Sequence, residues 1–216
     1  MRHGPFHPGT ALVDGPAGKI EVLVDVPTGP PRGLALVAHP QPLLGGSAGH
    51  KIPHLLARAL KDDGWLVVRP NFRGVGASEG THDEGTGETE DLLALVAQWR
   101  AAHPGLPLAL VGFSFGAFVQ SRVARRLLDA GRPPSHVVLA GMPAGPVEGQ
   151  RHYAPEGGLP NALVVHGEYD ERVPLSAVLD WARPQSQPVV VVPGADHFFT
   201  GRLPVLRALA LSHLQR

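Results

Sequence analysis

The stretch Leu110-Val111-Gly112-Phe113-Ser114-Phe115-Gly116-Ala117 decides how the rest of this chain is interpreted. The apolar run over residues 107–112 predicts a short strand, and residues 116–128 predict a helix. Gly-x-Ser-x-Gly between them forms a turn so tight that the flanking positions must lack side chains. Such a turn holds the serine in an unfavourable backbone conformation, with its hydroxyl clear of the sheet. A chain with 27 glycines can produce this pattern by chance, but the strand and helix that frame it favour Ser114 as a nucleophile.

Length and composition exclude several classes of function. The chain has 216 residues and is 43% hydrophobic, which predicts a single domain over residues 1–216 with a sizeable core. Lys and Arg together number 19, as do Asp and Glu, and no basic block occurs, so neither nucleic acid nor an anionic membrane surface is expected as a partner. Cysteine is absent, which excludes disulfides and a thiol nucleophile. No apolar run has signal-peptide or membrane-spanning length, so we expect a cytoplasmic protein.

Hydrophobic patterning predicts strands that alternate with helices. Residues 19–26 alternate apolar and polar side chains, as a half-exposed strand near a sheet edge does, whereas residues 33–39 are continuously apolar, as a strand covered on both faces is. The same reasoning predicts further strands over 65–69, 107–112, 136–140, 162–166 and 188–192, and helices over 52–61, 88–102, 116–128, 176–182 and 203–214.

This alternation predicts an α/β fold with a mainly parallel sheet of about seven to eight strands and helices on both faces. Only about twenty residues, rich in Pro and Gly, connect the strand that ends near Gly141 to the strand that begins near Ala162. A helical cap domain does not fit into that connection, so we expect Ser114 to face solvent.

Two further loops are predicted to open at the edge of the sheet that carries Ser114. One follows the strand ending at His166 and contains Asp170, and the other follows the last strand and contains His197. A serine hydroxyl is too weak an acid to attack unaided, so an imidazole has to take its proton and later pass it to the leaving group. A buried carboxylate holds that imidazole in the required tautomer. We therefore predict Ser114, Asp170 and His197 as catalytic residues.

Other residues compete for these roles. His39 also ends a strand on this edge, but its position in the sequence suits the orientation of a loop better than the role of base. Glu168 and Glu171 are interpreted as solvated loop charges. Asp196 is set aside because neighbouring residues in an extended loop point apart.

These blocks occur in an order that resembles the α/β-hydrolase superfamily over nearly the whole chain. The resemblance is strongest to the small, lidless bacterial serine hydrolases of its dienelactone-hydrolase-like and acyl-peptidase-like branch. It rests on His39-Pro40 with Gly45-Gly46, residues 71–80, Gly87-Glu88 with Asp91-Leu92, residues 112–116, residues 166–170 and residues 196–199. The order serine, acid, histidine is the one expected in this superfamily. True dienelactone hydrolases use a cysteine nucleophile, so Ser114 disfavours that activity.

A serine hydrolase of this kind also needs two backbone donors for the developing oxyanion. The N–H of Phe115, directly after the nucleophile, is predicted as the first. The second is expected from the loop after His39, where Pro40 and Pro42 lack an N–H. Gln41 is therefore the best-placed donor, and Leu43 is the next.

The predicted activity is that of a carboxylesterase which needs neither cofactor nor metal and cleaves small or medium acyl esters, its small-molecule substrates. His50 and His54 lack the glutamate of a zinc-protease signature, and His82-Asp83-Glu84 is interpreted as a polar surface loop. Thioesterase and acyl-peptidase activities remain alternatives, and so does a non-catalytic module that binds a small ligand or docks a partner. Apolar residues near the three catalytic positions are predicted to line the substrate pocket together with one histidine: His39, Leu43, Phe113, Phe198 and Phe199.

Overall fold

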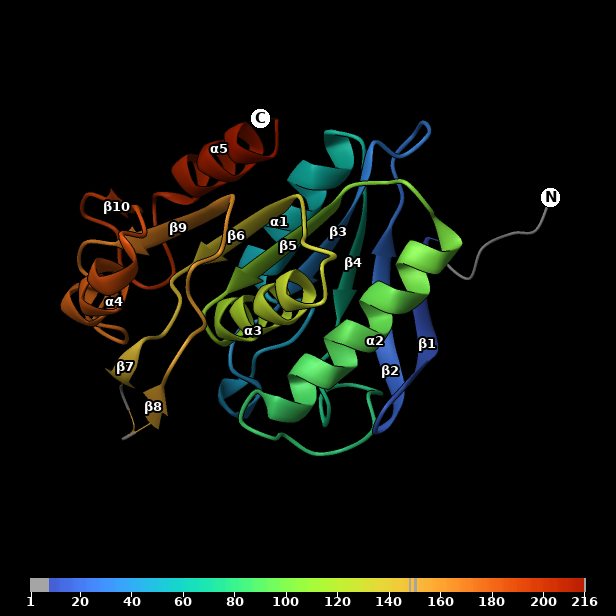
Figure 1. Cartoon of the computed structure of the whole chain (residues 1–216), viewed down its shortest axis with the longest axis horizontal. Coiled ribbons are helices and arrows are strands. Elements are labelled where there is room, and N and C mark those ends of the chain that lie inside the picture. The colour runs from blue at the N-terminus through green and yellow to red at the C-terminus, as the bar shows by residue number, and fades with distance from the viewer. Residues whose placement is uncertain (1–7, 148, 150, 216) are drawn as a thin grey trace.

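The computed structural model describes residues 8–147, 149 and 151–215, and it contains a sheet of eight strands in the order β1-β2-β4-β3-β5-β6-β9-β10 (Figure 1). Strand β2 runs antiparallel to both of its neighbours, β1 and β4. Every other neighbouring pair in this sheet is parallel. The mainly parallel α/β sheet predicted from the sequence is therefore confirmed. Its strands are β1 (Gly9–Gly15), β2 (Gly18–Asp25), β3 (Gly33–Ala38), β4 (Trp65–Pro70), β5 (Leu108–Phe113), β6 (His136–Ala140), β9 (Ala162–Gly167) and β10 (Val189–Val192).

Helices cover both faces of this sheet, as Figure 1 shows. Helices α2 (Thr86–Ala102), α3 (Phe115–Asp129) and α4 (Leu175–Ala182) contribute buried side chains to one apolar core, and α1 (Lys51–Asp62) and α5 (Leu203–Leu214) contribute to the other. In β3 the side chains alternate between the cores: Leu34 and Leu36 face the first, and Ala35 and Val37 face the second. The continuously apolar strands of the sequence are thus buried on both sides.

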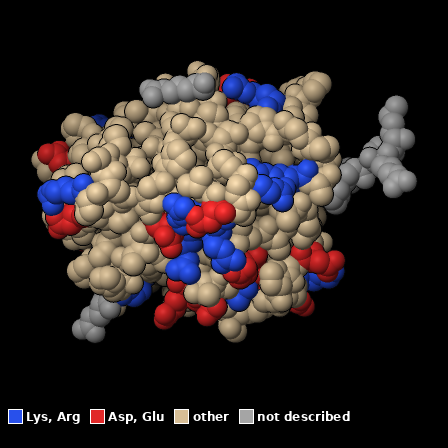
Figure 2. Space-filling view, in the orientation of Figure 1, with Lys and Arg blue, Asp and Glu red and all other residues tan. Residues whose placement is uncertain are grey.

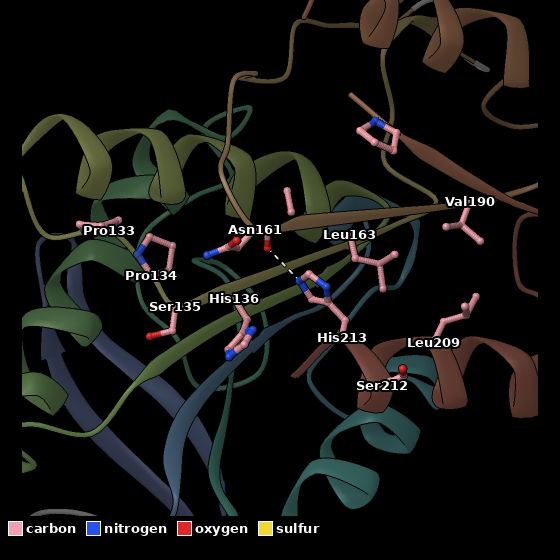
Figure 3. A pocket seen from close by; sticks show the side chains of 12 residues that line it. Pro133, Pro134, Ser135, His136, Asn161, Leu163, Val190, Leu209, Ser212 and His213 are labelled. Carbon is pink, nitrogen blue, oxygen red and sulfur yellow. Dashed lines mark hydrogen bonds between the residues drawn. The ribbon is translucent and has the colours of Figure 1, made fainter. Parts of the chain in front are cut away.

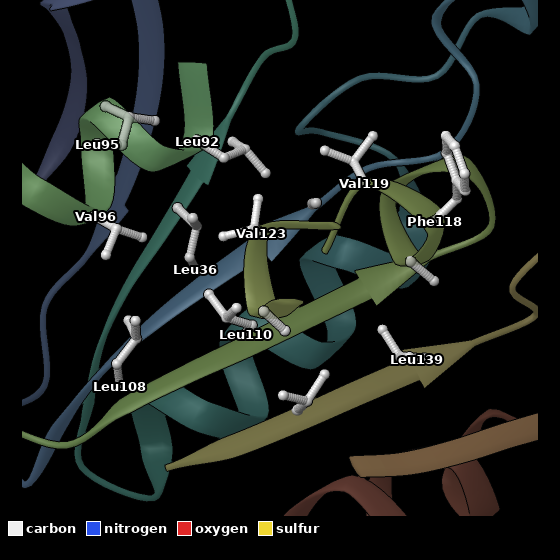
Figure 4. Close-up of a cluster of buried hydrophobic side chains, with 14 of the residues drawn as sticks. Leu36, Leu92, Leu95, Val96, Leu108, Leu110, Phe118, Val119, Val123 and Leu139 are labelled. Carbon is white, nitrogen blue, oxygen red and sulfur yellow. The ribbon is translucent and has the colours of Figure 1, made fainter. Parts of the chain in front are cut away.

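The first core is centred where α2 and α3 cross the middle strands (Figure 4). Leu92 and Leu95 of α2 and Val123 of α3 meet Leu36 and Leu110 of the sheet there. Full burial of one such side chain contributes roughly 1.5–3 kcal/mol to folding. This packing fixes α3, and with it the position of Ser114 directly before α3.

Two β features were missed by the hydrophobic pattern. Strand β1 pairs with β2 along its whole length, yet Val13 is its one buried side chain and Leu12 is 54% exposed. The second feature is a small hairpin of β7 (Gly145–Val147) and β8 (Arg151–Tyr153) in the connection after β6. Among the described residues of that connection there is no helix, so the predicted absence of a helical cap holds there.

Acidic and basic side chains lie close together on the face drawn in Figure 2. Arg126 of α3, for example, pairs with Glu90 of α2 across 2.9 Å. In the described part of the chain, no helix has the length and apolar character needed to cross a bilayer.

Candidate active site

Ser114 lies in the turn between β5 and α3, in a backbone conformation that side chains rarely adopt. Its φ is 54° and its ψ is −125°. A Cβ at Gly112 would lie 2.5 Å from the Cα of Ala117, and a Cβ at Gly116 would lie 2.5 Å from the carbonyl oxygen of Ala38. Such distances are too short for any side chain, so both flanking positions require glycine. The strained serine and its two glycines are the geometry predicted for a nucleophile turn.

The structure brings Ser114, His197 and Asp170 into one hydrogen-bonded chain. His197 Nε2 lies 3.0 Å from Ser114 Oγ, and His197 Nδ1 lies 2.7 Å from Asp170 Oδ2. The three residues follow β5, β10 and β9, whose carboxyl ends lie along the same edge of the sheet. The parallel topology therefore places them together although 83 positions separate the serine from the histidine.

The competing acidic residues have other partners or are exposed. Glu168 accepts a hydrogen bond from the N–H of Gly194, and Glu171 is exposed. Asp196 accepts a hydrogen bond from the N–H of Thr200, which is the main reason why its pKa is lowered. Of these carboxylates, only Asp170 is hydrogen-bonded to His197 in the structure.

Asp170 is held by its own loop and by a second histidine. Its Oδ1 accepts hydrogen bonds from the backbone N–H groups of Arg172 at 3.0 Å and Val173 at 2.8 Å. His166 Nε2 lies 2.9 Å from the carbonyl oxygen of Val173 and 3.4 Å from Asp170 Oδ2. Both neighbours are acceptors, so Nε2 carries the hydrogen, and burial lowers the pKa of His166 and keeps it neutral. Sequence reasoning placed His166 only at a strand end. The spacing of four residues between His166 and Asp170 was the feature of the sequence that could have indicated this contact.

His39 does not lie in the hydrogen-bonded chain of Ser114. The N–H of Phe72 points at its Nε2 across 3.0 Å, so Nε2 is the acceptor and Nδ1–H donates to the carbonyl oxygen of Pro40 at 2.7 Å. Burial lowers the pKa of His39 to about 4, although the bond to Pro40 opposes the shift. A neutral His39 thus fixes the start of the loop that contains Gln41, in line with the loop-orienting role predicted for it.

Gln41 and Leu43, the two candidates for the second oxyanion donor, differ in their surroundings. Leu43 directs its N–H toward Gln41 Oε1, at 3.4 Å, within the short 3₁₀ turn Pro42–Leu44. Gln41 donates through its side-chain Nε2 to the hydroxyl of Tyr153 at 3.0 Å, and its carbonyl oxygen accepts from the N–H of Gly46. These bonds hold the Gln41 backbone in place and occupy the N–H of Leu43, which favours Gln41 over Leu43 as the donor.

Known proteins are similar to this chain in fold and in sequence. A family model described as "alpha/beta hydrolase fold" matches residues 43–142. An α/β serine hydrolase homologue from Coxiella burnetii is 34% identical, with a TM-score of 0.84 over 98% of this chain and 100% of that chain. An α/β serine hydrolase without a lid from Xanthomonas campestris is 36% identical, with a TM-score of 0.83 over 99% of this chain and 97% of that chain. The chain belongs to the α/β-hydrolase family.

A curated relative matches part of this α/β hydrolase. The lysophosphatidylserine lipase ABHD12 of Danio rerio is 38% identical over 109 residues, which are 47% of this chain and 28% of that protein. The lidless relative from Xanthomonas campestris agrees with the absence of a helical cap between β6 and β9 in the described residues.

A narrow cavity of about 40 Å³ reaches Ser114 and His197 in this α/β hydrolase. The β7–β8 hairpin, which hydrophobic patterning did not predict, forms part of this cavity. The described residues that line the cavity are Gln41, Leu44, Ser114, Phe115, Pro143, Val147, Arg151, Tyr153, Arg172, Val173 and His197.

The lining differs from the one predicted, because none of the five predicted pocket residues is part of it. Leu43 is 69% exposed, and His39, Phe113 and Phe199 are fully buried. The Phe113 and Phe198 rings lie 5.3 and 5.2 Å from the ring of His197, so they pack around this histidine. Two of the predicted pocket residues, Phe113 and Phe198, therefore pack against His197. The cavity is lined mainly by residues of loops and of the hairpin.

A larger hollow of about 850 Å³ lies elsewhere (Figure 3). It is lined at the amino ends of β6 and β9 by residues that include His136 and Asn161, and His213 of α5 lies 2.8 Å from the carbonyl oxygen of Asn161. Ligands of open α/β sheets bind at the carboxyl ends of the strands. Among the described residues that line it there is no acid, so this part of the hollow lacks a component of a Ser-His-acid site.

Proposed function

We propose that this α/β hydrolase is a serine carboxylesterase that cleaves esters of small or medium acyl groups. The observation that carries the proposal is the continuous chain Ser114 Oγ, His197, Asp170, with contacts of 3.0 and 2.7 Å. A strained serine at the end of a central strand, hydrogen-bonded to an imidazole that a carboxylate orients, is the arrangement that nucleophilic acyl transfer needs.

In the proposed mechanism, His197 Nε2 takes the proton of Ser114 Oγ as that oxygen attacks the ester carbonyl. The backbone N–H groups of Phe115 and Gln41 stabilise the oxyanion. The tetrahedral intermediate then collapses, and His197 passes its proton to the departing alcohol. A water molecule, deprotonated by His197, attacks the acyl-enzyme. As the bond between the acyl carbon and Ser114 Oγ breaks, His197 returns the proton to Oγ, which releases the carboxylic acid and regenerates Ser114. Asp170 keeps the Nδ1–H of His197 directed at itself throughout.

One observation supports a small acyl group, and a second supports the ester bond. The cavity at Ser114 measures about 40 Å³, which leaves little room to enclose a long acyl chain. ABHD12, which is similar to this chain over 109 residues, is a lipase by name. Ester chemistry therefore occurs in a protein related to this part of the chain.

The test combines a fluorophosphonate label with 4-nitrophenyl esters of graded acyl length. The native protein should react with the label and hydrolyse the shortest esters fastest. Ser114→Ala should lose the label and reduce kcat by roughly 10⁵-fold or more. Ser212→Ala, which changes an exposed serine of the larger hollow, is the matched control and should behave as the native protein.

Several results would contradict the proposal. Labelling that persists in Ser114→Ala would place the nucleophile elsewhere. A folded native protein that neither reacts with the label nor turns over any ester would favour the non-catalytic binding module. A preference for acyl thioesters or aminoacyl amides over the matched esters would reassign the substrate to one of the two alternative enzyme classes.

A further inference from the structure

Tyr153 brings a phenol hydroxyl to the cavity that reaches Ser114. It is the last residue of β8 in the hairpin, it lines the cavity, and it is 8% exposed. The centroid of its ring lies 5.0 Å from that of Phe118 and 6.2 Å from that of Phe115, and both pairs meet edge to face. Because Phe115 and Phe118 belong to α3, the helix that begins directly after Ser114, this packing fixes the ring of Tyr153 relative to the serine.

The hydroxyl of Tyr153 is the acceptor in its hydrogen bond to Gln41. The side-chain Oε1 of Gln41 faces the N–H of Leu43 at 3.4 Å, so the atom that lies 3.0 Å from the Tyr153 hydroxyl is the amide nitrogen Nε2. An amide NH₂ group can only donate, which makes the phenol oxygen the acceptor.

This direction leaves the hydrogen of the Tyr153 hydroxyl available. A phenol has one hydrogen to donate, and within the described part of the chain no oxygen or nitrogen accepts it. Hydrogen bonds in series polarise one another, so the bond accepted from Gln41 makes the phenol a stronger donor. A buried donor of this kind in the wall of a reaction cavity can bind an acceptor on the substrate.

Tyr153 also contacts both residues whose N–H groups are proposed to bind the oxyanion. Its hydroxyl lies beside the Gln41 side chain, and its ring packs against that of Phe115. The cavity that these three residues line together with Ser114 measures about 40 Å³. In so small a space, an ester carbonyl that Ser114 attacks lies close to the Tyr153 hydroxyl as well.

We propose that the O–H of Tyr153 donates a third hydrogen bond to the oxyanion, beside the N–H groups of Phe115 and Gln41, so that Tyr153 is a catalytic residue. The hydrogen stays on the phenol oxygen, and no proton is transferred. The bond becomes stronger as negative charge develops on the carbonyl oxygen, so it stabilises the transition state more than the bound ester. The proposal rests on the proposed esterase function and adds a residue to its mechanism.

Tyr153→Phe tests the hydroxyl, because it keeps the ring and its packing against Phe118. With a short 4-nitrophenyl ester, kcat should fall roughly 10- to 100-fold and KM should stay nearly native, a smaller loss than for a sole oxyanion donor because two backbone donors remain. Tyr169→Phe is the matched control. It removes the hydroxyl of the chain's other tyrosine, which is 66% exposed, and should have native kinetics.

A trifluoromethyl ketone with a short alkyl chain tests the contact with the oxyanion itself. Ser114 Oγ adds to the ketone carbon, His197 takes the serine proton, and the ketone oxygen becomes an alkoxide that the donors bind. Tyr153→Phe should raise the inhibition constant of this ketone by the same factor by which it lowers kcat/KM. A higher KM with an unchanged inhibition constant would place the hydroxyl on another part of the substrate and overturn the proposal.

Gln41→Met separates a direct contact with the oxyanion from an effect transmitted through Gln41. Methionine keeps the backbone N–H of position 41 and removes the side-chain bond to Tyr153. If the hydroxyl binds the oxyanion, adding Tyr153→Phe to Gln41→Met should lower kcat further, by about 10-fold. A double variant with the kcat of Gln41→Met alone would show that Tyr153 acts only by holding Gln41, which would overturn the proposal.

The same measurements separate a failure of this proposal from a failure of the esterase function. Native kcat in Tyr153→Phe would overturn the role of the hydroxyl and leave the esterase function standing. A folded native protein that neither reacts with a fluorophosphonate nor turns over any ester would overturn the esterase function, and the role of Tyr153 with it.

Discussion

His197 Nδ1 lies 2.7 Å from Asp170 Oδ2, although the two residues are 27 positions apart. The same carboxylate is held on its other oxygen by the N–H groups of Arg172 and Val173, and His166 lies 3.4 Å from Oδ2. Every side of Asp170 thus meets a donor in a buried setting. Rotation of the carboxylate would break these contacts, and the one to His197 Nδ1 orients that ring with its Nε2 toward Ser114.

Replacing Asp170 with Asn should lower kcat by about 10⁴-fold, because an amide stabilises the wrong tautomer of His197. Steady-state kinetics on a short 4-nitrophenyl ester measures the effect. Glu171→Gln, an exposed neighbour on the same loop, is the control and should retain native kinetics. A near-native kcat in Asp170→Asn would show that another carboxylate orients the base.

His166 is predicted to position Asp170. His166→Leu removes the Nε2–H that faces Asp170 and Val173, and it should lower kcat about 10- to 100-fold with KM unchanged. His166→Gln can place an N–H nearby and should recover part of kcat. Val178→Ala, which trims a fully buried side chain of α4, should lower the melting temperature without lowering kcat. If His166→Leu lowers the melting temperature as Val178→Ala does and leaves kcat unchanged, His166 contributes to packing and does not position Asp170.

Acid should destabilise the protein through His39. The pKa of this buried histidine falls from 6.5 to about 4 on folding, so the unfolded chain binds the extra proton between these two values. Stability is therefore complete above about pH 6.5 and decreases as the pH falls toward 4, by about 3 kcal/mol for this group.

Urea unfolding at about pH 7.5 and about pH 4.5 measures this loss. In His39→Asn the difference between the two pH values should shrink. It should not vanish, since burial lowers the pKa of His166 as well. His152→Gln, an exposed histidine, is the control. An unchanged pH dependence in His39→Asn would contradict the prediction.

Gly46 should be required for the shape of the predicted oxyanion loop. A Cβ at this position would lie 2.1 Å from the carbonyl oxygen of Pro40, so Gly46→Ala has to displace the backbone beside Gln41. Loss of one oxyanion donor lowers kcat by roughly 10²–10³-fold, and we expect a fall of about 10²-fold here. Gly29→Ala meets no atom within 4 Å and should have native kinetics. Native kinetics in Gly46→Ala would remove Gln41 from the mechanism.

The sequence alone determined the central strands, their helices and the three residues predicted for catalysis. Strands such as β3 and β5 are apolar along their whole length because both faces are covered, and that pattern is local and readable. The proximity of Ser114, Asp170 and His197 could be predicted because parallel strands bring their carboxyl ends to one edge, so position after a strand predicts position in space.

The tertiary structure decided what depends on contacts between distant segments. Edge strand β1 buries little apolar surface, so its pairing with β2 leaves little pattern in the sequence. The hairpin places Tyr153 3.0 Å from the Gln41 side chain, 112 positions away, and thereby makes part of the cavity. His166 and Asp170 lie close together because the loop after β9 turns back toward His166. Periodicity reports which face of an element is buried, whereas loop conformation and long-range packing decide which side chains meet around the serine.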